Sequence, residues 1–288
     1  MPRIKRDILD CLRSVQLEIV SEIQRVCDRN GIRFFIEGGT LIGAARHKGF
    51  IPWDDDLDVS MLQEDYIRFL EVAPRELSRQ YKLVTWDTDE RYPNIFAKVE
   101  KRGTKFIEEG AAHSPHIQGI FVDVFPYLPD CHCRSSLVLI RPSIGMLRRV
   151  LIAQSGYTPW LENDSTVLAK FVAYLPLRLL AKLVPRKVLI RSLKALIGMD
   201  RSTVGFENVI VQGACRYREW TTPREWLADT VCLTFEDIDL PAPIRWHDYL
   251  ASRFGDYMVL PPVEQRVAHK PVLIDLGDGE HDIKAGSK

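Results

Sequence analysis

The sequence predicts an α/β protein, with a mixed β-sheet, helices packed on that sheet and a helical insert. Residues 4–29 place apolar side chains at spacings of three and four, which is typical of one amphipathic helix. Between residues 32 and 127, short apolar runs alternate with helical patterns, as expected of strands joined by helices. From residue 134 to residue 201, apolar and basic residues recur at helical spacing.

The composition is that of a globular protein. The chain has 288 residues, of which 46% are hydrophobic and 27% are charged, and its formal net charge is zero. A neutral chain argues against coating nucleic acid by charge, so no nucleic-acid partner is expected. The N-terminus lacks the apolar run of a signal peptide, and six cysteines are scattered without a framework. These features predict reduced thiols and a cytoplasmic location.

The other elements are expected in this order. A strand at residues 32–36 leads into a glycine turn, a short helix at 41–47 and an alternating strand at 54–61. A helix is expected at 63–80. Further strands are expected at 82–86, 95–100, 119–127, 207–218 and 231–236, and a further helix at 244–254.

We expect one catalytic domain over residues 1–288, made of four parts. They are a core (1–130), a basic helical insert (131–202), a C-terminal part of the catalytic unit (203–278) and a loose tail (279–288).

Acidic residues in the alternating segment form the first candidate site. Alternate residues of a strand point to one face, so Asp56 and Asp58 share a face that Asp54 can extend, while Leu57 and Val59 face the core. Carboxylates at this spacing can converge on Mg²⁺, or on Mn²⁺, which relieves their repulsion. The alternative is an acidic surface turn. The alternation with Leu and Val favours a half-buried strand, where acids without a cation would be costly.

The glycine turn is the second candidate. Gly38, Gly39 and Thr40 follow a strand and precede a helix. Glycines let the backbone approach a phosphate closely, and the N–H groups at a helix start attract anions. A Gly-Gly pair alone is usually a plain turn. Followed about sixteen residues later by Asp-x-Asp in a strand, it predicts a phosphate site beside a metal site.

Asp123 is the third candidate acid. It lies in the apolar segment GIFVDVFPY, which should be buried, so its charge needs a partner. That partner can be an arginine. As a neighbour of the Asp-x-Asp strand, Asp123 can instead complete the metal site or take a proton from an acceptor hydroxyl.

Three motifs together resemble those of the LicD/fukutin-type phosphotransferase family. They are GGTLIGAARHKGFIPWDDDLDVSM, GIFVDVFPY and FGDYMVLPPVEQRVAHKP, which span Gly38 to Pro271 around a divergent middle. The resemblance implies a nucleotidyltransferase-like core. It also implies transfer of a phospho-alcohol, such as phosphocholine or a polyol phosphate, from a CDP-linked donor to a cell-surface glycan precursor, with release of CMP.

The resemblance carries over to individual acids by position. Asp56 and Asp58 match the metal pair, Asp54 the acid just before it, and Asp123 the third acid. Asp54 and Asp123 both stay candidates for the general base. The resemblance implies no role for Glu37, the residue before the glycines, so the role of Glu37 is open.

Basic residues near these motifs are candidates for binding donor phosphates. They are Arg46, His47, Lys48, Arg266, His269 and Lys270. For His47 and Lys48 the alternative is an exposed helix end. For Arg266, His269 and Lys270 the alternative is a solvated basic face.

A zinc site is not expected. Cys131-His132-Cys133 is spaced too tightly for an ordinary structural site, and no second CxxC pair exists. His113 and His116 lie in a stretch with Pro and Ser that favours a loop.

Two rival functions use the same residues. One is a nucleotidyltransferase that moves a nucleoside monophosphate from an NTP to a small molecule and releases pyrophosphate. The other is a non-catalytic sugar- or nucleotide-binding protein. A binding module has no need of three clustered acids, which argues against the second rival.

The helical insert is basic. Residues 134–201 hold twelve Lys and Arg residues against three acidic residues, although the whole chain is neutral. Helices with apolar and basic faces bind membrane surfaces that carry anionic lipid. We therefore expect peripheral contact of this segment with the inner face of the cell membrane, where lipid-linked glycan acceptors of the resembled family are presented. The alternative is packed helices whose basic face is solvated or pairs with the acidic body.

Overall fold

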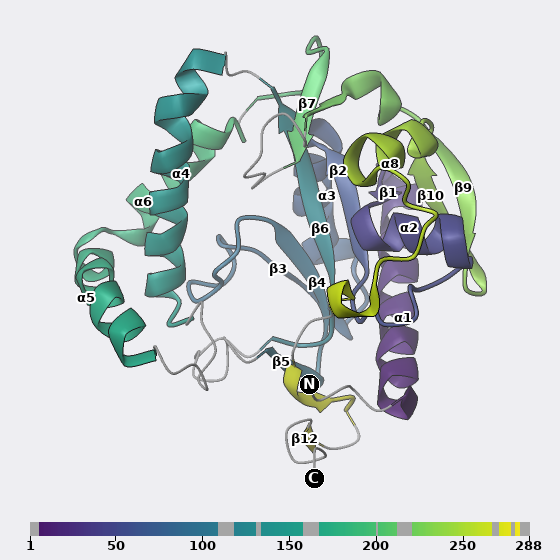
Figure 1. Cartoon of the computed structure of the whole chain (residues 1–288), viewed down its shortest axis with the longest axis horizontal. Coiled ribbons are helices and arrows are strands. Elements are labelled where there is room, and N and C mark those ends of the chain that lie inside the picture. Colours follow the sequence, from purple (N-terminus) through teal and green to yellow (C-terminus); the bar gives the residue numbers. More distant parts are fainter. Residues whose placement is uncertain are drawn as a thin grey trace.

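The computed structural model describes residues 6–108, 118–130, 134–157, 167–199, 201–211, 221–266, 271–277 and 280–282. At its centre is a seven-stranded mixed sheet with the strand order β1-β2-β6-β4-β3, which β7 and β8 extend from β6 (Figure 1). These strands are β1 Phe35–Ile36, β2 Asp58–Leu62, β3 Tyr81–Val84, β4 Ala97–Lys101, β6 Phe121–Pro129, β7 Asn208–Val211 and β8 Thr221–Pro223. Strands β2 and β6 are parallel, and the other neighbours in this sheet are antiparallel. The predicted mixed α/β fold is confirmed.

Two helices cover part of this sheet. Helix α1 (Arg6–Asn30) packs on β4 and β6, and α3 (Gln63–Glu76) packs on β2, β3 and β6. The apolar stripe of α1 is buried, as its spacing predicts, with Leu12, Ile19 and Ile23 fully covered.

Smaller elements flank the sheet. Helix α2 (Gly38–His47) lies beside the two-stranded sheet of β9 (Thr230–Phe235) and β10 (Ile238–Pro243), and α8 (Trp246–Phe254) packs on α2 and β10. A third sheet joins β5 (Lys105–Glu108), β11 (Pro271–Asp275) and β12 (Glu280–Asp282). Short 3-10 turns are η2 (Arg224–Trp226) and η3 (Val263–Gln265).

The basic insert is helical, as predicted. It contains α4 (Arg134–Gln154), α5 (Val167–Leu183) and α6 (Arg186–Ile197), and α4 packs against both of the others. These helices stand at one side of the central sheet, opposite the β9–β10 hairpin (Figure 1). Within the part of the chain that the structure describes, no helix has the length and apolar character needed to cross a membrane.

The structure corrects several predicted boundaries. Residues 38–40 are the first turn of α2 and not a turn before it, and β2 begins at Asp58, so residues 54–57 form a loop and not a strand. Strands β5, β8, β10 and β11 were not predicted. Part of the segment expected to be loose forms β12. Helix α8 begins at Trp246, because Pro243 still belongs to β10.

Candidate active site

Three neighbouring strands each carry one polar side chain at the same register. Asp58 on β2 lies opposite Asp123 on β6, and Asp123 lies opposite Lys98 on β4. The residues beside them on these strands, among them Val59 and Val122, are fully buried. Because side chains alternate along a strand, Asp58, Asp123 and Lys98 share the other face of the sheet. We call this set the polar row.

Lys98 and Asp123 form a buried ion pair. Lys98 Nζ lies 2.6 Å from Asp123 Oδ1, and the two residues are only 3% and 9% exposed. The ammonium also lies over the Phe121 ring, 3.2 Å from its centroid. The basic partner that a buried Asp123 requires is therefore a lysine and not the arginine considered from the sequence. Its place in an apolar run, IFAKVE, was the signal that sequence reasoning overlooked.

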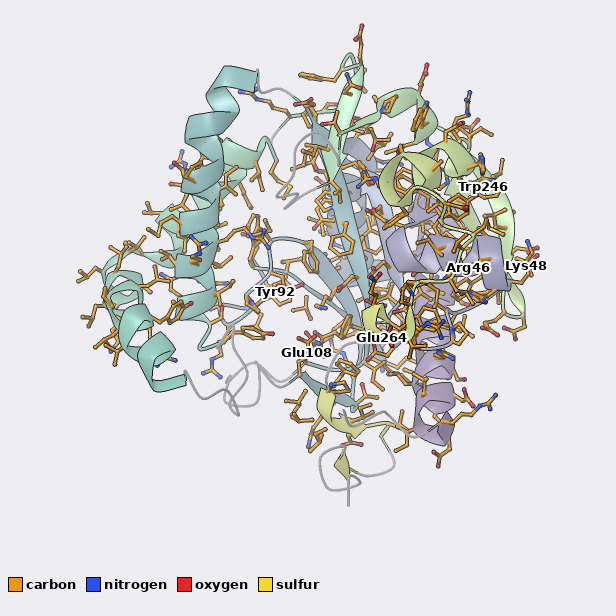
Figure 2. The ribbon with its side chains drawn as sticks, viewed as in Figure 1. Arg46, Lys48, Tyr92, Glu108, Trp246 and Glu264 are labelled. Carbon is orange, nitrogen blue, oxygen red and sulfur yellow. The ribbon has the colours of Figure 1, made fainter. Side chains whose placement is uncertain are left out.

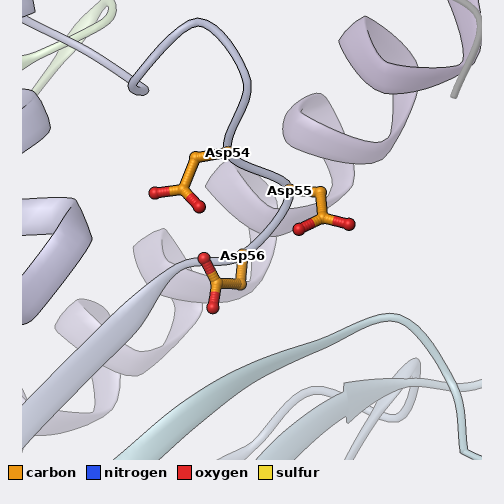
Figure 3. Close-up of side chains that lie close together, drawn as sticks. All are labelled: Asp54, Asp55 and Asp56. Carbon is orange, nitrogen blue, oxygen red and sulfur yellow. The ribbon is translucent and has the colours of Figure 1, made fainter. Parts of the chain in front are cut away.

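An acidic loop precedes β2. Asp54, Asp55 and Asp56 each have a carboxylate oxygen within 4.8 Å of the others (Figure 3). Helix α1 holds the backbone of this loop: Arg13 Nη2 donates to the Asp54 carbonyl at 2.7 Å, and Gln16 Nε2 donates to the Asp55 carbonyl at 2.9 Å. Asp55 was not predicted as a site residue, because the strand expected over 54–61 would point it away from its two neighbours.

The field of these acids acts on Asp58. Burial, followed by the negative charges of Asp56, Asp123, Glu37 and Asp54, holds the pKa of the Asp58 carboxyl well above its ordinary value. Four further carboxylates around a half-buried carboxylate are an unfavourable arrangement in the absence of a cation. Oxygen donors of this kind are the ligands that Mg²⁺ and Mn²⁺ prefer, so the residues present fit a divalent ion.

The first turn of α2 lies against these acids. A Cβ atom at Gly39 would lie 2.8 Å from Asp54 Oδ2, and one at Gly38 would lie 4.0 Å from Asp58 Oδ2. The hydroxyl of Thr40 accepts a hydrogen bond from the Asp58 N–H at 2.9 Å. The structure therefore brings together the glycine pair, Thr40 and the acids. N–H groups at a helix start favour anions, and the start of α2 lies next to Asp54 and Asp58.

Glu37 has a structural place beside this turn. Its side chain is 6% exposed and accepts hydrogen bonds from Ser60, from Tyr127 at 3.3 Å and from Tyr249 at 3.2 Å. Arg253 Nη2 donates to the Tyr127 hydroxyl at 3.0 Å. Burial, followed by the charge of Glu37, raises the pKa of both tyrosines. This network joins the residue between β1 and α2 to β2, β6 and α8, and sequence reasoning did not find it.

Two predicted basic residues, Arg46 and Arg266, lie close to each other, and Arg266 lies beside the acidic loop. The Arg266 guanidinium stacks over the Trp53 ring at 4.5 Å, next to Asp54 in sequence. Arg46 Nη1 donates to the Tyr257 carbonyl at 2.7 Å, and burial, followed by the charge of Arg266, lowers its pKa. The C-terminal motif and α2 therefore present neighbouring guanidinium groups.

The other predicted basic residues are placed differently. His47 Nε2 accepts from Arg46 Nε at 2.9 Å, and burial lowers the pKa of His47. Lys48 is exposed at the C-terminal end of α2, away from the glycine turn (Figure 2). His269 and Lys270 lie outside the described residues, as do Cys131, His132, Cys133, His113 and His116.

The segment that contains these residues matches a known protein family. Residues 31–136 match the family model described as LicD/FKTN/FKRP, nucleotidyltransferase domain. Residues 31–136 are a nucleotidyltransferase domain of the LicD/FKTN/FKRP family. This LicD-type domain contains the glycine turn, the acidic loop and the whole polar row.

Individual relatives agree with this assignment. The chain is 28% identical over 258 residues to the lipopolysaccharide cholinephosphotransferase LicD of Haemophilus influenzae, an alignment that covers 88% of this chain and 93% of the relative. It is 44% identical over 55 residues to the human ribitol 5-phosphate transferase FKRP, covering 19% of this chain and 11% of that protein. An uncharacterized protein of Rickettsia prowazekii, RP689, is 35% identical over 97 residues, covering 31% of this chain and 35% of the relative.

Proposed function

We propose that this protein transfers a phospho-alcohol from a CDP-linked donor to a glycan precursor, in a reaction that depends on a divalent cation. The observation that carries the proposal is the placement of the polar row and the acidic loop against the first turn of α2, inside the LicD-type domain. Two relatives whose names describe transfer of phosphocholine and of ribitol phosphate support the reaction class.

The residues of the site divide into two groups. Asp56, Asp58 and Asp123 would hold Mg²⁺ or Mn²⁺, which when bound neutralises phosphate charge and stabilises the charge that develops during transfer. We assign Arg266, which stacks over the ring of Trp53 beside Asp54, and its cationic neighbour Arg46 to the donor phosphates. The N–H groups of the first turn of α2 add hydrogen-bond donors for the same phosphates.

The transfer itself forms and breaks one bond to phosphorus. The acceptor hydroxyl oxygen bonds to the phosphorus that carries the alcohol, the bond from that phosphorus to the CMP oxygen breaks, and CMP leaves with the electron pair. The hydroxyl proton passes to a carboxylate. We assign this role to Asp54, because Asp123 Oδ1 already binds the Lys98 ammonium at 2.6 Å.

The leaving group distinguishes this proposal from its main rival. The purified protein is incubated with Mg²⁺ and either CDP-choline, CDP-ribitol or CDP-glycerol, or with each of the four ribonucleoside triphosphates, together with candidate glycan acceptors. We expect CMP from one of the CDP-alcohols and no pyrophosphate. Release of pyrophosphate from a triphosphate, without CMP from any CDP-alcohol, would identify a nucleotidyltransferase instead.

A further inference from the structure

Helix α5 turns apolar side chains toward solvent. One arc of this helix carries Val172, Leu175, Leu179, Leu180 and Leu183, which are 59%, 44%, 55%, 42% and 79% exposed. The opposite arc contains Ala181, which is 5% exposed, and Leu177, which packs against the core. A surface helix ordinarily presents polar residues to water, so an apolar outer arc of this size indicates a binding surface.

The three insert helices are also uniformly basic. Helices α4, α5 and α6 contain eleven Lys and Arg residues in their sequences and no Asp or Glu. Two of the eleven attach the insert to the core. Arg186 donates a hydrogen bond to the carbonyl of Tyr92, which is labelled in Figure 2, at 2.8 Å. Lys194 forms an ion pair with Asp87 at 2.9 Å.

Apolar and basic groups meet where α5 joins α6. Exposed Leu183 and Val188 flank the short connection between the helices, and exposed Lys182 and Lys187 stand beside them. Helix α5 lies on the side of α4 that faces away from the central sheet, so this corner is at the edge of the molecule (Figure 1).

We propose that the outer arc of α5 and the α5–α6 corner bind the surface of a membrane that contains anionic lipid. Leucine side chains on the arc enter the boundary between headgroups and acyl chains, while Lys182 and Lys187 contact lipid phosphates. An anionic surface fits because the three insert helices carry basic and no acidic residues, and a lipid surface fits because the exposed arc is aliphatic. The inference does not depend on the proposed transfer reaction.

Sedimentation with vesicles tests this surface. The full chain is mixed with vesicles of phosphatidylcholine alone, or of phosphatidylcholine with phosphatidylglycerol, at low salt and at about 0.5 M salt. We expect binding to the anionic vesicles at low salt, at least about tenfold weaker binding at high salt, and little binding to neutral vesicles.

Matched variants separate the two kinds of contact. Leu179→Ser/Leu183→Ser keeps the charge and should weaken binding about tenfold or more, because two apolar anchors are lost. Lys182→Glu/Lys187→Glu should weaken it by at least as much. The control Arg75→Glu/Arg79→Glu makes the same change of net charge at exposed positions outside the insert, and should bind almost as the wild type does. Circular dichroism checks that each variant is folded.

Two results would overturn the proposal. One is equal recovery in the supernatant with both kinds of vesicle at low salt. The other combines two observations. Leu179→Ser/Leu183→Ser binds vesicles as the wild type does, and sedimentation equilibrium shows that the wild type is a dimer whereas this variant is a monomer. That result would assign the arc of α5 to a second copy of the chain.

Discussion

Asp58 is half-buried among other carboxylates, so replacing it should raise stability but weaken metal binding. In EDTA, Asp58→Asn removes a charge that burial and its neighbours disfavour, so Tm should rise by about 2–4 °C. Added Mg²⁺ should raise the Tm of the wild type and leave that of the variant almost unchanged. Asp239→Asn, at an exposed acid of β10, is the control and should respond to Mg²⁺ as the wild type does. A normal Mg²⁺ response in Asp58→Asn would contradict its assignment as a ligand.

Gly39 leaves room for the Asp54 carboxylate. A Cβ atom at this position would lie 2.8 Å from Asp54 Oδ2, so Gly39→Ala forces the short Asp54 side chain to move. Turnover should fall about tenfold or more, because small displacements of catalytic groups are costly, while unfolding free energy changes little. Gly145→Ala in α4 is the control, since a Cβ atom there meets nothing within 4 Å. Equal turnover of the two variants would show that Gly39 does not position Asp54.

The ion pair of Lys98 and Asp123 predicts strong energetic coupling. In EDTA, Lys98→Met leaves Asp123 buried beside Asp58 without its cation, and should destabilise the protein by about 3 kcal/mol. The double variant Lys98→Met/Asp123→Asn should recover most of that loss, because no unpaired charge remains. Urea unfolding of the wild type, both single variants and the double variant gives the coupling free energy. Additive effects of the two substitutions would mean that the pair contributes little.

At the scale of elements, Glu22 ties α1 to the segment that joins α3 to β3. Its carboxylate accepts two hydrogen bonds from Arg25 at 2.8 Å and one from the Ser78 N–H at 2.6 Å. The hydrogen bonds from Arg25, chiefly, lower the pKa of Glu22 to about 2. Because the folded pKa lies below the unfolded value, the stabilisation is complete above about pH 4.5 and is lost as the pH falls toward 2.

This linkage gives a prediction for acid unfolding. Glu22→Gln should lower the unfolding free energy by about 2 kcal/mol at pH 7, and the difference from the wild type should shrink as the pH falls from about 4.5 toward 2. Denaturant unfolding at several pH values measures it. Glu71→Gln, an exposed residue of α3, should show no such pH-dependent difference. A difference of the same size at pH 7 and pH 2.5 would argue against the lowered pKa.

The sequence predicted those elements whose pattern is local. Helix α1 and the insert helices follow from apolar spacing, and β4 and β6 from short apolar runs. The acidic loop was predicted as a strand, because its conformation depends on Arg13 and Gln16, which bind its carbonyl groups from a distant part of the chain. Strands β5 and β11 pair with each other across most of the sequence, a contact that no local pattern contains.

Contacts between distant parts of the chain also limit what the sequence could predict of the site. The Asp-x-Asp spacing and the apolar setting of Asp123 are visible in the sequence. The structure places Asp58 and Asp123 on adjacent strands and Asp56 in the loop before β2. The pairing with Lys98 depends on the register of β4 against β6, and the hydroxyl groups around Glu37 come from β2, β6 and α8. Such contacts follow from the sheet as a whole and not from spacing along the chain.

At the scale of the whole molecule, the acidic site and the exposed apolar surface belong to different parts of the chain. The acidic site lies in the LicD-type domain, and the apolar surface lies in the insert. Residues 31–136 contain the acids and the glycine turn, whereas α5, the helix that carries the exposed apolar arc, follows this segment. The alignment with the Haemophilus influenzae relative covers 88% of this chain, so the likeness extends beyond the LicD-type domain. We infer that the domain performs the transfer and that the insert positions it.

A time course of CMP release from a CDP-alcohol, in the presence of a glycan acceptor, shows whether these acids catalyse phospho-alcohol transfer. We expect CMP release that needs Mg²⁺, stops in EDTA and resumes when Mg²⁺ is restored. It should fall by at least about 10²-fold in Asp58→Asn but not in Asp239→Asn. Equal CMP release by the wild type and Asp58→Asn, or release that continues unchanged in EDTA, would contradict the claim that these acids form the centre of phospho-alcohol transfer.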